Sequence, residues 1–205
     1  HSNVDGVWTF DTTKNIQSTM LSSMFSQAMA QETYDAHLAG LNWSLSTSTS
    51  GVTISCSGYS DRLLDLALKL LTDFFKQGDD SLSFFRDFYF NSTKDNFVRS
   101  LSTYFQSRRA DSHAMYYRDL LMSNSTSAID DSLSAAKAAS LRSLQAHHTA
   151  ILEHTENTIE CLCTGNVSSV EATTFFKKAS KIVIAAKNGE ERTSQRRGRL
   201  WVPGT

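Results

Sequence analysis

The fold is decided by two neighbouring segments, YDAHLAGL at residues 34–41 and GVTISCSGYSDRL at residues 51–63. In the first, Gly40 stands where the C-terminus of a helix needs a left-handed backbone. Apolar and polar residues then alternate on both sides of a Ser/Thr/Gly turn, which predicts two antiparallel strands with one buried face. The apolar positions are Leu41, Trp43 and Leu45, followed by Val52, Ile54 and Cys56. Ser60 and Asp61 can cap a following helix, so the whole stretch predicts a helix–hairpin–helix unit.

Helical periodicity accounts for most of the remaining chain. Apolar residues recur every three or four positions, which predicts helices over 18–38, 60–78, 81–104 (with a kink at 91–96), 111–122 and 129–154, the last as two short helices. A strand is expected at 158–164, followed by a turn at Gly165-Asn166 and a final helix capped by Ser168 or Ser169. Residues 7–10 fit a short edge strand. Together these elements predict an α+β fold in two layers, with helices packed on one face of an antiparallel sheet.

The domain organisation follows from a change of composition near the C-terminus. Residues 187–198 are polar and charged, which is typical of a flexible linker, and a short apolar run follows at 200–202. We therefore expect residues 1–186 to form a single domain, with N-terminal strands that are shortened or truncated. Residues 187–205 are predicted to be a linker toward a following domain.

Composition excludes some classes of partner. The formal net charge of −1 gives no general attraction to nucleic acid or to an anionic membrane. The three cysteines, Cys56, Cys161 and Cys163, are too few for a disulfide framework, so a reducing, cytoplasmic location is favoured. Cys161 and Cys163 lie about 6.6 Å apart on one face of the predicted strand. A soft metal ion would need further ligands there, and packing as small buried hydrophobic groups is the preferred interpretation.

Residues 34–63 also carry a resemblance. The chain is similar to the third, non-catalytic domain of insulinase/pitrilysin-type (inverted zincin) metallopeptidases, nearest to the group of insulin-degrading enzyme and nardilysin. That group has Tyr-x-Ala-x-x-Ala-Gly-Leu, a hairpin, and then Gly-Tyr-x-Asp-x-Leu. The matching residues are Tyr34, Ala36, Ala39, Gly40, Leu41, Gly51, Gly58, Tyr59, Asp61 and Leu63, followed in order by Arg99-Ser-Leu, His113-Ala-Met-Tyr-Tyr, Leu120-Leu-Met and Gly165-Asn166. The chain departs from the pattern at Ser102, where the family has Asn, and near Ala110, where a proline is missing.

The resemblance implies a fold like that of LuxS and mitochondrial processing peptidase. It also implies a parent zinc metalloendopeptidase that encloses peptides between two halves, with this chain forming part of the chamber wall. The implied partners are the other domains of the same polypeptide and the peptide substrates, and uncovered domain surfaces imply self-association of the chain alone. The alternative is a domain of a catalytically inactive homologue that acts as a binding or scaffolding protein.

The zinc motif of the family, His-x-x-Glu-His, is expected on another domain of the parent. The nearest match here is Ala150-Ile-Leu-Glu153-His154, with alanine in place of the first ligand. His147 lies roughly 10 Å from His154 along a helix axis, at ~1.5 Å per residue, which ligand bonds of about 2 Å do not span. His148 points to a different side of the helix. We therefore expect no catalytic residue, metal ligand or cofactor in this chain.

His113, Tyr116 and Tyr117 are the residues most open to a binding role. A histidine beside two phenols suits contact with a peptide on the inner wall of a chamber. The preferred alternative is helix packing, with Met115 and one tyrosine turned inward. The residues within 34–63 that match the family pattern, together with Arg99, are the signature residues. We expect them to have structural roles.

Overall fold

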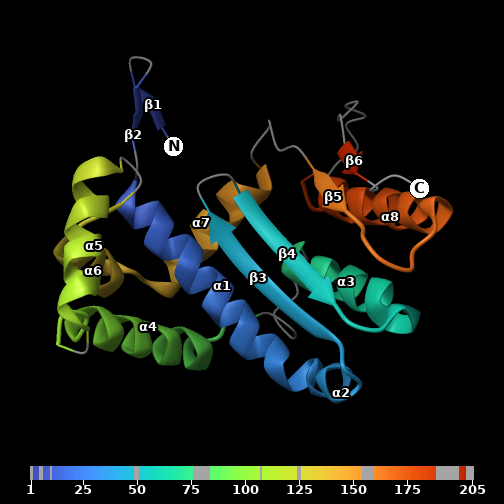
Figure 1. Cartoon of the computed structure of the whole chain (residues 1–205), viewed down its shortest axis with the longest axis horizontal. Coiled ribbons are helices and arrows are strands. Elements are labelled where there is room, and N and C mark those ends of the chain that lie inside the picture. Colours follow the sequence, from blue (N-terminus) through green and yellow to red (C-terminus); the bar gives the residue numbers. More distant parts are fainter. Residues whose placement is uncertain are drawn as a thin grey trace. The chain divides into compact units, whose positions relative to one another are not determined.

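The computed structural model describes residues 2–4, 7–9, 11–48, 51–75, 84–106, 108–123, 126–153, 159–187 and 199–201. The chain divides into two compact units. The first contains the described parts of His1–Met29, Leu45–Thr53 and Phe84–His148, and the second contains those of Ala30–Ser44, Ile54–Ser83 and Thr149–Thr205. Each unit is therefore built from segments that are distant in sequence. Helix α1 (Thr12–Glu32) and the hairpin of β3 (Asn42–Ser48) and β4 (Gly51–Ser57) contribute to both units (Figure 1).

The predicted helix over 18–38 is wrong at its start and in its continuity. Helix α1 begins earlier, at Thr12, and a separate short helix, α2 (Tyr34–Leu38), follows Thr33. Thr33 is buried, and its hydroxyl accepts a hydrogen bond of 2.9 Å from the indole N–H of Trp43. The break between α1 and α2 falls at this threonine, which is hydrogen-bonded to a residue ten positions later. Helical periodicity alone does not predict that contact.

Helix α2 ends as the sequence predicts. Gly40 has a φ of 82°, in the left-handed region. The N–H of Gly40 donates to the carbonyl of His37, and the N–H of Leu41 donates to the carbonyl of Ala36. This pair of bonds is the Schellman motif, which satisfies carbonyls that the end of a helix leaves free. The chain is thereby turned directly into β3.

The hairpin returns to this helix end at Gly58. Gly58 has a φ of 142°, and a Cβ placed on it would lie 2.6 Å from the carbonyl oxygen of Gly40 and 2.9 Å from the Cα of Leu41. Only glycine permits two backbones to approach so closely. Helix α3 (Ser60–Phe75) then begins two residues later, at the residue predicted for it. We call Gly40, Leu41 and Gly58 the glycine junction.

The first unit is a group of helices around the N-terminal part of α1. Met20, Leu21, Met24 and Phe25 of α1 are fully buried. The other helices are α4 (Asp87–Ser102), α5 (Ala110–Met122), α6 (Ile129–Ala138) and the first part of α7 (Leu141–Glu153). The predicted pair of short helices at 129–154 is confirmed. Strands β1 (Ser2–Val4) and β2 (Val7–Thr9) pair antiparallel in the same unit.

Helix α4 begins at Asp87 and not at residue 81, as the sequence predicted, although residues 81–83 lie outside the described ranges. The preceding residue, Arg86, has an extended backbone. Phe84 is buried instead, with its ring 5.3 Å from that of Phe25 in α1. Helix α4 is continuous through residues 91–96, where a kink was expected.

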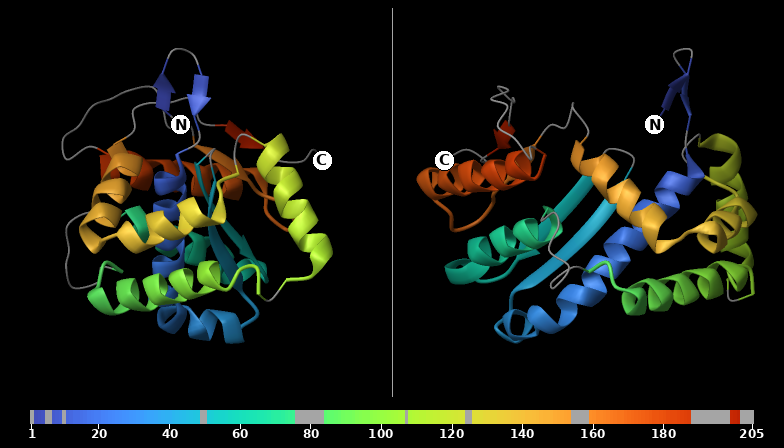
Figure 2. Two further views of the ribbon diagram at one scale, coloured as in Figure 1. Left: turned by 90° about the vertical axis from the view of Figure 1, so that its left-hand side faces the viewer. Right: turned by 180° about the vertical axis from the view of Figure 1, so that it is seen from behind.

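Helices α4 and α6 pack against each other (Figure 2). Lys94 of α4 donates hydrogen bonds of 2.7 and 2.6 Å to the carbonyls of Lys137 and Ala139, at the C-terminus of α6. These carbonyls lack partners within the helix, and the lysine charge also suits the negative end of the helix dipole.

The second unit pairs α3 with α8 (Ser169–Lys187) (Figure 1). The predicted cap of α8 is confirmed, because the carboxylate of Glu171 accepts the N–H of Ser168 while the hydroxyl of Ser168 accepts the N–H of Glu171. Strand β5 (Glu160–Leu162) pairs in parallel with β6 (Arg199–Trp201). Strand β6 falls within residues 187–205, for which the sequence predicted a linker.

The α+β class is confirmed. The strands that the structure describes form three two-stranded pairs, and the parallel β5–β6 pair differs from the antiparallel sheet that was predicted. Parallel partners come from segments far apart in the chain, so no local turn signal announces them. The predicted domain boundary at residue 186 stays a prediction.

The glycine junction generates a stability prediction. Gly58→Ala should lower the free energy of unfolding by roughly 2–6 kcal/mol, in two parts. A side chain in this glycine-only region of the backbone costs about 1–3 kcal/mol, and the forced contact with Gly40 and Leu41 adds about 1–3 kcal/mol. Chemical denaturation measures the loss.

Gly51→Ala is the matched control. Gly51 has nearly the same φ, 141°, but no atom lies within 4 Å of the added Cβ. Gly51→Ala should therefore lower the free energy of unfolding by the backbone part alone. Equal losses in the two variants would mean that the close approach at Gly58 contributes nothing.

Candidate functional site

Five ring side chains gather where α4 ends and α5 begins. Their ring centroids lie 5.1–6.2 Å apart in the contacts that join them, and Phe105 touches all four of the others. We call this group the aromatic cluster; its members are Tyr104, Phe105, His113, Tyr116 and Tyr117. The guanidinium of Arg108 lies 4.0 Å from the centre of the Tyr104 ring, a cation–π contact.

The cluster follows from helical spacing. His113 is three residues before Tyr116 and four before Tyr117, so the three side chains project from neighbouring positions on α5. The hydroxyl of Tyr116 accepts a hydrogen bond of 3.0 Å from the backbone N–H of Ile129, the first residue of α6. This N–H is one of those that the start of a helix leaves without a partner. Tyr116 therefore links α5 to the start of α6.

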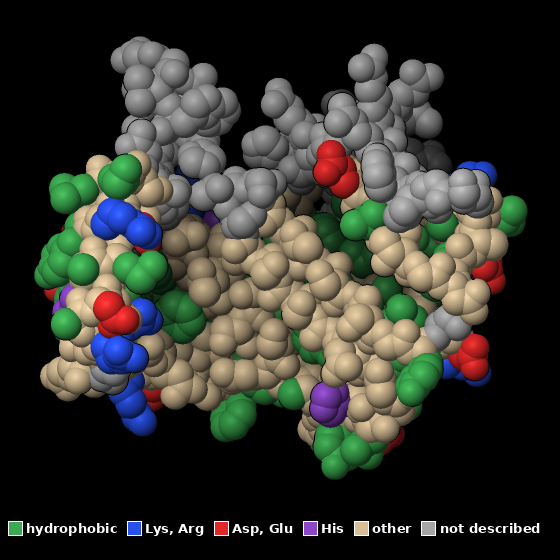
Figure 3. Space-filling view, in the orientation of Figure 1, with side chains coloured by type: hydrophobic (Ala, Val, Ile, Leu, Met, Phe, Trp, Pro, Cys, Tyr) green, Lys and Arg blue, Asp and Glu red, His purple; other side chains and the backbone are tan. Residues whose placement is uncertain are grey.

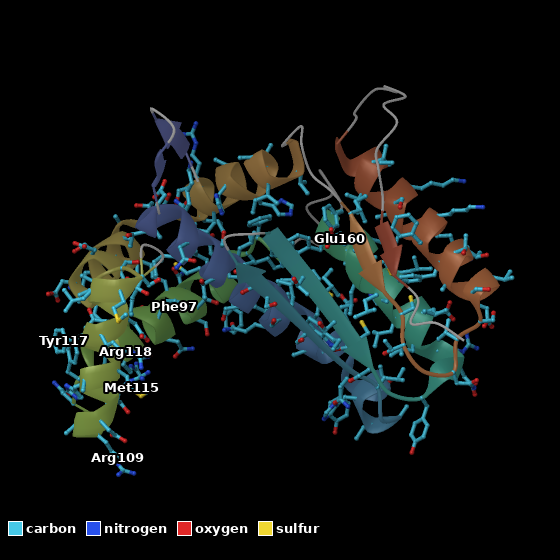
Figure 4. The ribbon with its side chains drawn as sticks, turned by 45° about the horizontal axis from the view of Figure 1, so that its top comes forward. Phe97, Arg109, Met115, Tyr117, Arg118 and Glu160 are labelled. Carbon is cyan, nitrogen blue, oxygen red and sulfur yellow. The ribbon has the colours of Figure 1, made fainter. Side chains whose placement is uncertain are left out.

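Helix α5 carries large apolar side chains that are exposed on more than one of its sides. We define the α5 apolar surface as Met115, Tyr117, Leu121 and Met122, whose exposed fractions are 54, 53, 86 and 81%. Figure 3 shows hydrophobic side chains gathered over α5 with charged ones between them. Met115, Tyr117 and Arg118 project from the helix in Figure 4. Large apolar side chains grouped on a surface are typical of sites that contact another molecule.

The structure separates the three residues that the sequence singled out. His113 and Tyr116 are half-buried within the aromatic cluster, whereas Tyr117 is both a member of the cluster and exposed. The packing interpretation holds for Tyr116 but is wrong for Met115, which is turned to the surface. Contact of His113, Tyr116 or Tyr117 with a peptide stays a prediction.

The signature residues divide between the glycine junction and the surface. The ring of Tyr59 lies against Gly40, 3.1 Å from the position of an added Cβ, and the carbonyl of Ala36 accepts the N–H of Leu41. The other signature residues lie outside the glycine junction and are exposed: Tyr34, Ala39, Gly51, Asp61 and Arg99. Their structural role therefore stays a prediction.

The histidines of α7 have protein partners. Nε2 of His147 lies 2.7 Å from the hydroxyl oxygen of Ser18 in α1. Burial, and then the nearby charge of Lys14, lower the pKa of His147, so its neutral form is favoured in the folded chain. His148 is buried with its ring against those of Phe84 and Phe85. His154 lies outside the described residues.

Ser18 and His147 are 129 positions apart, and sequence reasoning did not connect them. A serine hydroxyl bonded to an imidazole is also the starting arrangement of nucleophilic catalysis. Ser18 lies inside α1, however, where the surrounding backbone N–H groups are used by the helix and do not form an oxyanion hole. Asp11 accepts the N–H groups of Thr13 and Lys14, as a cap of α1. The pair therefore joins two helices.

The residues present do not fit a catalytic zinc ion. Ala150 occupies the first ligand position of the nearest His-x-x-Glu-His match, and alanine offers no ligand atom. Within the part of the chain that the structure describes, no group of three or more His, Cys, Asp or Glu side chains is placed to hold a metal ion. Nor does any described helix combine the length and the apolar character needed to cross a membrane.

The described residues form an α+β fold, and its distinct features are the glycine junction, the aromatic cluster and the α5 apolar surface. A family model described as the middle or third domain of peptidase M16 matches residues 8–135, which include all three features. The chain therefore belongs to the peptidase M16 family, and the predicted relationship to insulinase-type peptidases is confirmed. A search of curated proteins found no match. The nearer relationship to insulin-degrading enzyme and nardilysin stays a prediction.

The aromatic cluster generates a prediction that separates its two tyrosines. Tyr116→Phe removes the acceptor for the N–H of Ile129, and should lower the free energy of unfolding by about 0.5–1.5 kcal/mol. Tyr117→Phe is the control. Its ring contacts are kept and its side chain is half exposed, so the change should stay within about 0.5 kcal/mol. Urea denaturation of both variants gives the comparison, and equal losses would contradict the structural role of the Tyr116 hydroxyl.

Proposed function

We propose that this chain is a non-catalytic domain of an insulinase-family zinc metalloendopeptidase that degrades peptides, and that it forms part of the wall of the substrate chamber. The observation that carries the proposal is the match of the peptidase M16 middle or third domain over residues 8–135. The zinc ion and the His-x-x-Glu-His motif belong, in this proposal, to another domain of the same polypeptide. This chain supplies neither ligands nor a proton-transfer group.

The contribution of such a domain is enclosure. A peptide held between chamber walls loses its freedom before the chemical step, and the cost of positioning it is met by binding contacts. A closed chamber also excludes large folded proteins by size. The α5 apolar surface supports this role, because exposed Met, Tyr and Leu side chains suit either an extended peptide or a neighbouring domain.

Tyr117 is the residue we assign to peptide contact. Its ring is half exposed, and the packing of Phe105 and Tyr116 against it holds the ring in place. A ring that is already ordered loses little conformational entropy when a ligand binds. The rest of the α5 apolar surface is assigned to the neighbouring domains, which explains why the chain alone is expected to self-associate.

The test compares the chain alone with the full-length protein. The chain alone should carry no stoichiometric zinc by elemental analysis and should not cleave a fluorogenic peptide. The full-length protein should do both. In the full-length protein, Tyr117→Ala should raise KM for the peptide roughly three- to tenfold, the equivalent of one lost aromatic contact, with little change in kcat.

Val170→Ala is the matched control for this substitution. Val170 is an exposed apolar residue of α8, and its loss should leave both kinetic constants unchanged. Stoichiometric zinc with peptide cleavage in the chain alone would overturn the non-catalytic assignment. An unchanged KM in Tyr117→Ala would remove Tyr117 from the chamber wall. A full-length protein that binds peptides without zinc or cleavage would favour the inactive, scaffolding homologue.

A further inference from the structure

Two thiols lie side by side at the end of strand β5 in the second unit. Cys161 and Cys163 flank Leu162, and their sulfur atoms are 3.6 Å apart. Both cysteines are half-buried, while the side chain of Leu162 between them is 65% exposed. This is the alternation of a strand, in which residues i and i+2 share a face. Figure 4 shows the strand, marked by its first residue, Glu160.

The distance between the sulfurs suits one bridging atom better than a disulfide bond. Two bonds of about 2.3 Å that meet at roughly 90–110° hold their sulfurs about 3.3–3.8 Å apart, and the observed 3.6 Å lies in this range. A disulfide bond needs sulfurs about 2.05 Å apart, with Cα atoms about 4.4–6.8 Å apart. Residues i and i+2 of a strand are about 6.6 Å apart, at the upper end of that range. A single atom can therefore bridge the thiols with less movement of the backbone.

Two properties of the site limit which atom can bridge the sulfurs: the number of available ligands and the protonation of the thiols. Among the described residues no third His, Cys, Asp or Glu joins the pair to complete a metal site. Burial, together with the hydrogen bond to Cys163, raises the pKa of Cys161 to about 12. A divalent metal ion binds thiolates, so its binding must release their protons to solvent, which a high pKa opposes. A ligand that carries an oxygen leaving group takes up both protons as water, so no net proton is released.

Trivalent arsenic meets both conditions. An organic arsenoxide, R–As=O, condenses with two thiols to give R–As(SR)₂ and one water molecule. Two As–S bonds form, the As=O bond and both S–H bonds break, and the two protons leave on the oxygen as water. Neither arsenic nor sulfur changes its oxidation state. We propose that Cys161 and Cys163 form a vicinal dithiol site that chelates a trivalent arsenical through both sulfurs.

Titration of the fully reduced chain with phenylarsine oxide, followed by intact-mass measurement, tests the proposal. We expect one phenylarsenic group per chain, removed by 2,3-dimercaptopropanol but retained in the same concentration of a monothiol. Cys161→Ala and Cys163→Ala should each lose the adduct. Cys56→Ala is the control and should keep it, since Cys56 is a single half-buried thiol on β4.

Peptide mapping of the unaltered chain makes the test independent of how the variants fold. The adduct should map to the one peptide that contains both Cys161 and Cys163. An adduct that survives either substitution, maps to Cys56 or is removed by the monothiol would overturn the proposal. So would a fully reduced chain that forms no adduct.

Discussion

The close approach of Gly58 to Gly40 and Leu41 is the constraint on which the helix–hairpin–helix region depends. At this point the end of β4 lies against the end of α2, with backbone atoms where a side chain would otherwise be. The left-handed Gly40 and the two Schellman hydrogen bonds set the direction in which the chain enters β3. The start of α3 follows directly, so three changes of chain direction are fixed by a few backbone contacts. Side chains add to these contacts, because Cδ2 of Leu41 also lies 2.9 Å from the position of the Gly58 Cβ and the ring of Tyr59 lies against Gly40.

The side chains of helix α5 have two roles. Its inner side is joined to the rest of the first unit by the aromatic cluster and by the bond from Ile129 to Tyr116. Its exposed Met115, Leu121 and Met122 keep large apolar groups in water, which costs solubility without adding to the stability of the unit. Exposed apolar side chains are expected in a domain that forms one part of a larger enclosing protein. The family to which the chain belongs supplies the context for this proposal.

The sequence predicted the elements whose signals are local. The alternation on either side of the turn identified β3 and β4, and the choice of Ser168 or Ser169 as a cap located the start of α8. The left-handed backbone at Gly40 was also predicted, whereas the approach of Gly58 to it was not. These signals succeed because capping, turns and periodicity act within a few residues.

What the sequence did not predict depends on contacts between distant residues. The break at Thr33 goes with the bond from Trp43, and the late start of α4 goes with the burial of Phe84 against Phe25. Contacts between distant residues also determine three further features that the sequence did not predict. They are the parallel pairing of β5 and β6, the bond between Ser18 and His147 and the outward position of Met115. For the candidate site, the residues of α5 could be named from sequence. Which of them faced the surface was set by the cluster and by α6.

The most direct test of the account is an NMR measurement at the glycine junction. Because the Cα of Leu41 lies 2.9 Å from where a Cβ of Gly58 would be, the α-protons of the two residues are near neighbours. Nuclear Overhauser spectra of the chain should contain cross-peaks from the Gly58 α-protons to the α-proton and a methyl group of Leu41. Absence of these cross-peaks in a folded sample would show that the hairpin does not return to the end of α2, and would contradict the account.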